Sequence, residues 1–203
     1  MIAPLAVTAV ALPLFAALTI LVAGHPGPTG LDSTVLHAVD DLNGGAGVAV
    51  AKIVTLFGTL PVTAAVALAA AFTLRRRPAE AAVLVASVIA IYIAVHVTKA
   101  ATDRPRPPDP LAGSTLSAFP SGHSAYSTIY VAAAILTRRP AMTAAAIALA
   151  FAIGASRIYL RVHWATDVLA GWALGAAIFG GATAIAVVVG RLRNNEGRTL
   201  PWP

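Results

Sequence analysis

Six apolar segments, each close to the length of a membrane-spanning helix, constrain the fold of this chain more than any other feature. An α-helix needs about 17 to 25 predominantly apolar residues to cross the hydrocarbon core of a bilayer. The segments are residues 4–23, 48–74, 80–98, 121–137, 141–160 and 164–189. At 58% hydrophobic and 11% charged, the 203 residues are too apolar for a soluble domain. We therefore expect a single all-α domain over residues 1–203, built as a bundle of six transmembrane helices.

The first apolar segment could also be read as a secretory signal peptide. It has no Lys or Arg before its apolar stretch, and it is long for the hydrophobic part of such a signal. We expect a retained helix. The absence of cysteine excludes disulfides, thiolate metal sites and cysteine nucleophiles.

Basic residues between the apolar segments predict the orientation, because Lys and Arg accumulate in short cytoplasmic loops. Eight arginines fall on one side by this rule: Arg75, Arg76, Arg77, Arg138, Arg139, Arg191, Arg193 and Arg198. We expect that side and both termini to be cytoplasmic in a multi-pass protein of the cell membrane. The net charge of +6 then reports topology, and we expect no nucleic-acid partner. Five basic residues on the other side need a different reason: Lys99, Arg104, Arg106, Arg157 and Arg161.

The segment between the first two apolar runs, residues 24–47, predicts a short interfacial helix in the first outward loop. Apolar residues recur there at helical spacing: Leu31, Val35, Val39 and Leu42. Acidic residues occupy other angles: Asp32, Asp40 and Asp41. An ordinary polar loop with one helical turn is the alternative. At the other end of the chain, residues 194–203 are typical of a short polar tail.

The third apolar segment ends in a basic string that runs from Lys99 to Pro107. Its prolines stop the helix and hold the chain extended, so that Arg106 can fold back over Lys99. Two cations could then meet one anion, with a planar fork from Arg and a compact charge from Lys. A basic patch that binds anionic headgroups is the alternative for this string alone.

A second string, Pro120 to His123, directly precedes the fourth apolar run. A helix that begins there presents unpaired backbone N–H groups and a dipole that favours negative charge. Ser121 can add a hydroxyl, Gly122 permits close backbone approach and His123 can move a proton. Ser121 could equally be a simple N-cap, and His123 a hydrogen-bonded histidine at the interface.

A third string places Ser156 and Arg157 ahead of His163 and Asp167. If the sixth helix begins near His163, the i, i+4 spacing puts Asp167 on the same helical face. The carboxylate can then accept the Nδ1 proton and leave Nε2 free as a nucleophile or base. Compensation of the helix dipole is the alternative role of Asp167. Topology brings all three strings to one face of the membrane, which predicts a phosphate site.

In this order, K-x6-R-P, P-S-G-H and S-R-x5-H-x3-D resemble the three-part signature of the type 2 phosphatidic acid phosphatase (PAP2) superfamily. That superfamily also includes soluble acid phosphatases and vanadium haloperoxidases. The matching residues are Lys99, Arg106 and Pro107; Pro120, Ser121, Gly122 and His123; and Ser156, Arg157, His163 and Asp167.

The resemblance implies a phosphatase that needs no metal or other cofactor and works through a phosphohistidine. His163 would attack phosphorus, Asp167 would orient it, and His123 would protonate the leaving group. The phosphoryl oxygens would be held by the remaining signature groups: Lys99, Arg106, Ser121, the Gly122 amide and Arg157. Arg104 and Arg161 border the strings as secondary candidates, for a second phosphate or anionic headgroups, or else as solvated rim charges.

We expect an integral-membrane lipid phosphatase at the outer face, with polyprenyl pyrophosphate as the first substrate candidate. Phosphatidic acid and phosphatidylglycerophosphate are alternative substrates.

A vanadate-dependent haloperoxidase and an anionic-lipid binder or transporter are the competing functions, although a pure binder has no need for His163 and Asp167 in register. The partners expected are a lipid phosphate, membrane lipids and a possible second copy of the chain. The small-residue pair Gly171 and Gly175 indicates close helix packing within the bundle or in a dimer.

Overall fold

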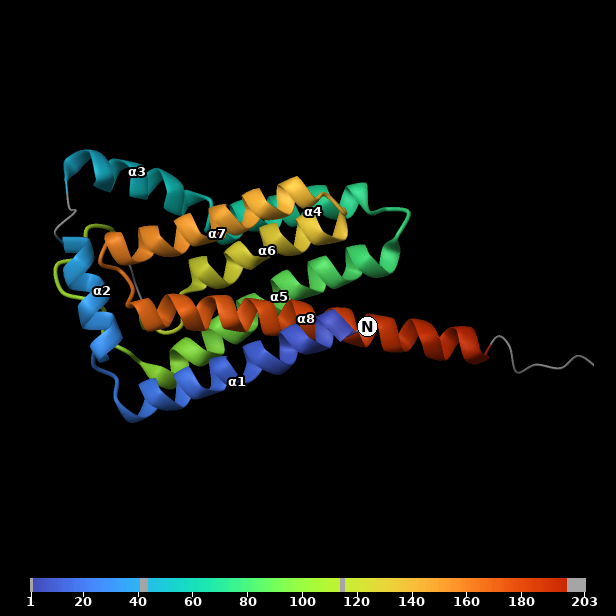
Figure 1. Ribbon diagram of the computed structural model, residues 1–203, viewed down its shortest axis with the longest axis horizontal. Coiled ribbons are helices and arrows are strands. Elements are labelled where there is room, and N and C mark those ends of the chain that lie inside the picture. The colour runs from blue at the N-terminus through green and yellow to red at the C-terminus, as the bar shows by residue number, and fades with distance from the viewer. Residues whose placement is uncertain (1, 41–43, 114–115, 197–203) are drawn as a thin grey trace, which may run out of the picture.

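The computed structural model of the chain describes residues 2–40, 44–113 and 116–196, and every regular element in these ranges is an α-helix. The eight helices are α1 (Ile2–Gly24), α2 (Gly30–Asp40), α3 (Gly45–Leu56), α4 (Leu60–Thr73), α5 (Pro78–Thr102), α6 (Gly122–Leu136), α7 (Pro140–Tyr159) and α8 (Ala165–Glu196). Most of them run along one long axis, whereas α2 lies across one end of the bundle (Figure 1). The predicted all-α class is confirmed.

Four helices are long and apolar enough to cross a membrane: α1, α5, α7 and α8. The bent pair of α3 and α4 would add a fifth span. With 15 residues, α6 is shorter than such a helix needs to be. The structure therefore shows a multi-pass bundle with four or five candidate spans among the described residues, and the count of six stays a prediction.

The expectation of one continuous helix over residues 48–74 is wrong, because α3 and α4 meet at an angle of 46°. Pro61 lies in the first turn of α4 and has no amide to donate to the carbonyl of Phe57. That carbonyl instead accepts a hydrogen bond from the Tyr130 hydroxyl of α6 at 2.5 Å. An apolar run alone carries no sign of this break, since both halves remain apolar.

The centre of the bundle is α6, which packs against α4, α5, α7 and α8. Gly171 and Gly175 let α8 approach it closely. A Cβ at Gly171 would lie 2.4 Å from the Ser121 carbonyl oxygen, and one at Gly175 would lie 2.3 Å from the Thr128 hydroxyl. The two glycines therefore serve packing within the bundle, as the first of the two interpretations expected.

Two predicted boundaries need correction at the C-terminal end. The last helix was expected over residues 164–189 with a polar tail from residue 194, but α8 continues to Glu196. No proline interrupts residues 165–196, so no residue in this stretch forces the helix to end. Arg198 and the rest of the predicted tail lie outside the described residues, as do Asp41 and Leu42.

The helix predicted in the first loop is confirmed as α2, and its most buried residue is acidic, although Val35 and Val39 of the predicted apolar face are half-buried. Asp32 is 1% exposed, whereas Leu31 is 49% exposed. Asp40 pairs with Arg161 at 2.6 Å. The carboxylates of α2 thus point towards α7 and α8, against which the helix packs. Its place at the membrane interface remains a prediction.

Candidate active site

All three strings meet at the end of the bundle that α2 crosses (Figure 1). The C-terminal ends of α5 and α7 and the N-terminal ends of α6 and α8 lie there. The loop residues that follow α5 run back between these helix ends. Residues as far apart in the sequence as Lys99 and Asp167 therefore supply one site.

Lys99 and Arg106 converge on one oxygen atom. The Lys99 Nζ and the Arg106 Nη2 both donate to the carbonyl of Ser117, at 2.5 and 3.4 Å. The Arg106 Nη1 also donates to the carbonyl of Val162, and it lies 3.5 Å from the Nε2 of His163. The fold-back of Arg106 that the prolines predicted is therefore present, and both cations lie within reach of one anion.

Arg157 is the third cation of this site, after Lys99 and Arg106. Its residue is 5% exposed, and its Nη1 donates to the Thr55 hydroxyl at 2.7 Å. Its Nε is buried without a hydrogen-bond partner among the residues that the structure describes. A buried guanidinium with an unused donor is costly unless an anion completes its bonding, so this geometry suits a phosphoryl oxygen.

His163 lies between the cations and a carboxylate. Its residue is 3% exposed, its Nε2 faces Arg106, and its Nδ1 lies 3.4 Å from the Asp167 Oδ2. That separation is within ion-pair range, but Nδ1 makes no hydrogen bond within the described part of the chain. Such contacts are often long before substrate binds. Burial, followed by the charges of Lys99, Arg157 and Arg106, lowers the pKa of His163 well below its ordinary value, so the imidazole is neutral.

Asp167 faces His163, but not along one helical face as the i, i+4 spacing predicted. Because α8 begins at Ala165, His163 precedes the helix, and the two side chains do not share a helical face. Asp167 instead reaches back across the first turn, where its Oδ2 accepts the Trp164 amide at 2.9 Å. This is the backward half of a capping box. Capping and contact with His163 are thus combined in one carboxylate.

The second string places Ser121 as the N-cap of α6. Its Oγ accepts hydrogen bonds from the Ser124 hydroxyl at 2.9 Å and the Ser124 amide at 3.4 Å. The capping alternative is therefore present, and contact of Ser121 with phosphate remains a prediction. Gly122 begins α6, and a Cβ there would make only ordinary contacts at 3.5 Å, to Tyr126 and Val95. Packing does not require glycine at this position.

His123 packs against the break between α3 and α4. A Cβ built at Gly58 would lie 2.9 Å from the His123 Cβ and 2.7 Å from the Ile153 Cγ2. Gly58 therefore leaves room for the histidine. Sequence reasoning missed it, although a glycine just before Pro61 is a signal for a helix break.

The two secondary candidates are both engaged with carboxylates. Arg161 donates through Nε to Asp40 at 2.9 Å, which joins the end of α7 to α2. Arg104 is 1% exposed and pairs with Asp32 and Asp167. The interpretation of Arg104 as a solvated rim charge is therefore wrong, while its contact with phosphate or headgroups stays a prediction that these ion pairs disfavour.

Ser117 and Asp32 are further site residues that the motifs did not indicate. The Ser117 carbonyl receives Lys99 and Arg106, and its Oγ accepts the Arg104 amide at 2.8 Å. Nothing in the sequence around Ser117 marks it, since its role depends on a backbone oxygen. Asp32 had a visible signal, a carboxylate in the first turn of a predicted helix, but not a visible partner.

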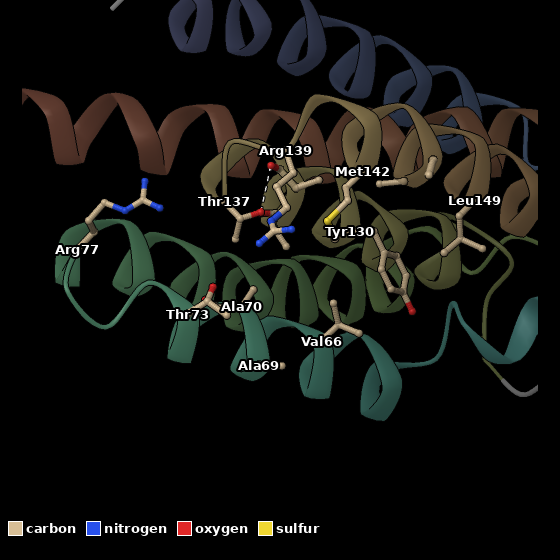
Figure 2. Close-up of a pocket in the computed structure, with 14 residues that line it drawn as sticks. Val66, Ala69, Ala70, Thr73, Arg77, Tyr130, Thr137, Arg139, Met142 and Leu149 are labelled. Atoms are coloured by element: carbon tan, nitrogen blue, oxygen red, sulfur yellow. Dashed lines mark hydrogen bonds between the residues drawn. The ribbon is translucent and has the colours of Figure 1, made fainter.

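A separate hollow of about 710 Å³ lies between α4, α6 and α7 (Figure 2). Its walls are mainly apolar, with Arg77 and Arg139 near one end and Tyr130 and Leu149 near the other. None of the predicted site residues lines it. It is thus distinct from the histidine site.

A buried neutral histidine lies beside a carboxylate and three cations at one end of an apolar helical bundle, an arrangement that suits an anionic ligand. Residues 80–191 match the sequence profile of the PAP2 superfamily. The chain belongs to this superfamily, whose membrane phosphatases hydrolyse phosphate esters, and the expected family is confirmed.

Two solved structures share the fold. One is the first transmembrane PAP2 type phosphatidylglycerolphosphate phosphatase from Bacillus subtilis, with a TM-score of 0.75 and 24% identity over 93% of this chain and 98% of that one. The other is LpxE from Aquifex aeolicus, with a TM-score of 0.64 and 22% identity over 78% of this chain and 96% of that one. No curated protein matches the sequence significantly. The likeness establishes the fold of a membrane PAP2-type phosphatase.

Proposed function

We propose that the protein is an integral-membrane lipid phosphatase that works through a phosphohistidine. One observation carries the proposal: the Nε2 of a neutral, buried His163 lies beside Arg106, whose guanidinium shares an acceptor with Lys99. A nucleophile and two cations are thus placed around one position. A protein that only binds an anion gains nothing from a neutral histidine there.

In the first step, the Nε2 lone pair of His163 forms a bond to phosphorus as the bond from phosphorus to the lipid oxygen breaks. His123 donates a proton to the departing oxygen, and Asp167 balances the positive charge that develops on the His163 ring. In the second step, water attacks phosphorus and gives a proton to His123. The bond between phosphorus and Nε2 breaks, which releases phosphate and restores both histidines.

Electrostatic stabilisation of the transition state supplies much of the rate enhancement in this scheme. Lys99, Arg106 and Arg157 neutralise the phosphoryl oxygens, and the amides at the start of α6 add the positive end of a helix dipole. The unused Nε of Arg157 gives such an oxygen a ready donor.

For the topology, we propose six crossings, with α3 and α4 as one bent span and α6 as a short one. Both termini are then cytoplasmic, and the site faces outward. Because α6 has only 15 residues and begins at the site, His123 lies near headgroup depth. A lipid phosphate could reach it without leaving the bilayer.

For the substrate, we propose polyprenyl pyrophosphate first, on the resemblance of the three sequence strings to those of membrane PAP2 phosphatases. A lipid monophosphate such as phosphatidylglycerophosphate is the second candidate, and a specific observation favours it. Arg104 and Arg161, the residues expected to bind a second phosphate, are held by carboxylates. The Bacillus subtilis relative is also described as acting on this class of lipid.

Purified protein in detergent, assayed for phosphate release from polyprenyl pyrophosphate, phosphatidic acid and phosphatidylglycerophosphate, tests the proposal. Wild type should hydrolyse at least one of them, with full activity in EDTA and inhibition by vanadate. His163→Ala should release no phosphate. Activity that survives this substitution, or bromide oxidation with peroxide in place of hydrolysis, would overturn the proposal.

A further inference from the structure

Arg104, which is not one of the PAP2 signature residues, lies at the centre of a buried network of hydrogen bonds and ion pairs. Its side chain is 0% exposed, as are those of both its acidic partners. Its Nη1 donates to the Asp167 Oδ1 at 2.5 Å, and its Nη2 donates to the Asp32 Oδ2 at 2.7 Å. One guanidinium therefore ties α2 to the first turn of α8.

The other contacts of Arg104 use up its remaining donor capacity. Its Nε donates to the Pro26 carbonyl at 3.2 Å and its Nη2 to the Gly27 carbonyl at 3.1 Å, while its Nη1 also reaches the Thr166 hydroxyl at 2.7 Å. Only the five N–H groups of arginine, spread in one plane, can make this set of bonds. Arg104 is thus bound by protein on every side.

Asp32 anchors this arrangement from α2. Its carboxylate accepts the Thr166 amide at 2.8 Å and the Thr29 amide at 2.9 Å. Burial opposes ionisation of Asp32, but hydrogen bonds from the Thr166 and Thr29 amides and from Arg104 outweigh it and lower its pKa. Asp32 therefore stays charged and balances the guanidinium, which a buried ion pair requires.

The network leaves Asp167 one orientation. Its Oδ1 is held by Arg104 and its Oδ2 by the Trp164 amide, so rotation of the carboxylate would break two charge-assisted hydrogen bonds. In that orientation the Oδ2 faces the His163 Nδ1. Without Arg104, the Oδ1 would be buried without its charged partner, and the carboxylate could turn.

We propose that Arg104, held by Asp32, is a positioning residue that orients Asp167 towards His163 and thereby sets the rate of phosphoryl transfer. This inference rests on the proposed function, because it gives Arg104 a part in that same reaction. Arg104 does not touch the phosphoryl group, which Lys99, Arg106 and Arg157 hold. The substitutions that remove it should therefore affect turnover and leave phosphate binding nearly intact.

The test compares Arg104→Gln, Arg104→Lys and Asp32→Asn with wild type in the purified, detergent-solubilised full chain. The probes are phosphatidic acid in mixed micelles and vanadate as a competitive inhibitor. Arg104→Gln should lower kcat about 10- to 100-fold, the range for residues that orient a reacting group, with KM and vanadate inhibition within about threefold of wild type. Arg104→Lys should recover part of the loss, and Asp32→Asn should lose less than Arg104→Gln. The matched control is Arg77→Gln, which removes another Arg–carboxylate pair, with Glu80 at 2.7 Å, and should keep full activity.

A wild-type kcat in folded Arg104→Gln would overturn the inference, as would a large loss of vanadate inhibition, which would mean that Arg104 binds phosphate. If Arg104→Gln does not fold, the kcat and the vanadate inhibition of the milder variants Arg104→Lys and Asp32→Asn test the inference instead. A loss of kcat with normal vanadate inhibition supports the inference, and wild-type kcat in both overturns it. If wild type itself hydrolyses none of the three lipid phosphates tested for the proposed function, that function fails, and this inference fails with it.

Discussion

The His163 imidazole stays neutral because it is buried beside three cations. Its lowered pKa makes the stability of the folded protein depend on pH. The unfolded chain titrates its histidines near the ordinary pKa of about 6.5, whereas the folded pKa of His163 is well below that. Between the two values the unfolded state binds more protons, so stability must fall as pH decreases.

We therefore expect the melting temperature in detergent to decrease from pH 7 to pH 5. His163→Gln should show a smaller decrease, because it removes a group that must stay neutral in the folded state. Thermal unfolding followed by intrinsic fluorescence at pH 5, 6 and 7 measures both slopes. Equal slopes in the two proteins would contradict the assignment of a lowered pKa to His163.

A substitution at Gly122 distinguishes a requirement for phosphate binding from a requirement for helix packing. A Cβ there would meet Tyr126 and Val95 only at 3.5 Å, an ordinary contact. Gly122→Ala should therefore keep its melting temperature while phosphate release falls about tenfold or more, because the methyl group crowds the phosphoryl oxygens at the start of α6. Gly181→Ala, at a position with no atom within 4 Å of its Cβ, is the control. Full activity in Gly122→Ala would show that no phosphoryl oxygen lies beside this amide.

At the scale of single residues, the sequence predicted which side chains meet at this end of the bundle better than it predicted their hydrogen-bond partners. Spacing and the family signature indicated His163 and Asp167, although the contact runs back across a helix start and not along a helical face. Arg104 was misjudged because its partner, Asp32, lies on α2, 72 residues away in the sequence. Burial of a charge by a distant element leaves no local pattern.

At the scale of elements, the break between α3 and α4 positions His123. Gly58→Ala should lower stability by about 1–3 kcal/mol, because its Cβ would press on Ile153 and His123. It should also reduce phosphate release by displacing the histidine. Gly45→Ala, where nothing lies within 4 Å, should change neither. Unfolding in denaturant and the phosphate assay measure the two effects, and a fully stable and active Gly58→Ala would refute this placement of His123.

The elements themselves were predictable wherever one apolar run makes one helix. The runs that became α1, α5 and α7 were located within a few residues. The break after α3 was not, because it depends on Pro61 together with a hydroxyl from α6. The burial of Asp32 on α2 was also not predicted, since its partners, Arg104 after α5 and Thr166 on α8, are brought to it only by folding.

At the scale of the whole molecule, the fit of α8 against α6 brings the last helix to the site. Gly175→Val should destabilise the protein by about 1–3 kcal/mol or more, because its side chain would overlap Thr128 and the Ala125 carbonyl. Gly181→Val lies in open space on the same helix and should be tolerated. Size-exclusion profiles and melting temperatures of the two variants compare them directly. Equal stability would mean that α8 does not pack on α6 as described.

The overall class and the meeting of the three strings at one end followed from the sequence, since apolar length and motif order indicate both. The number of crossings stays a prediction, because α6 is short and α3 and α4 are bent. These departures from regular spans occur around the site, where helix ends must present His123, His163 and the cations together. Regular membrane helices alone would leave those groups at separate depths.

The central claim is that His163 carries the phosphoryl group, and trapping that intermediate tests it most directly. Wild type should be mixed with a lipid substrate labelled in its terminal phosphate and quenched in base, where phosphohistidine survives. The account predicts label on the peptide that contains His163, no label in His163→Ala, and normal labelling in His96→Ala, a control at an exposed histidine of α5. Phosphate release by wild type without labelled His163, or label retained in His163→Ala, would contradict it.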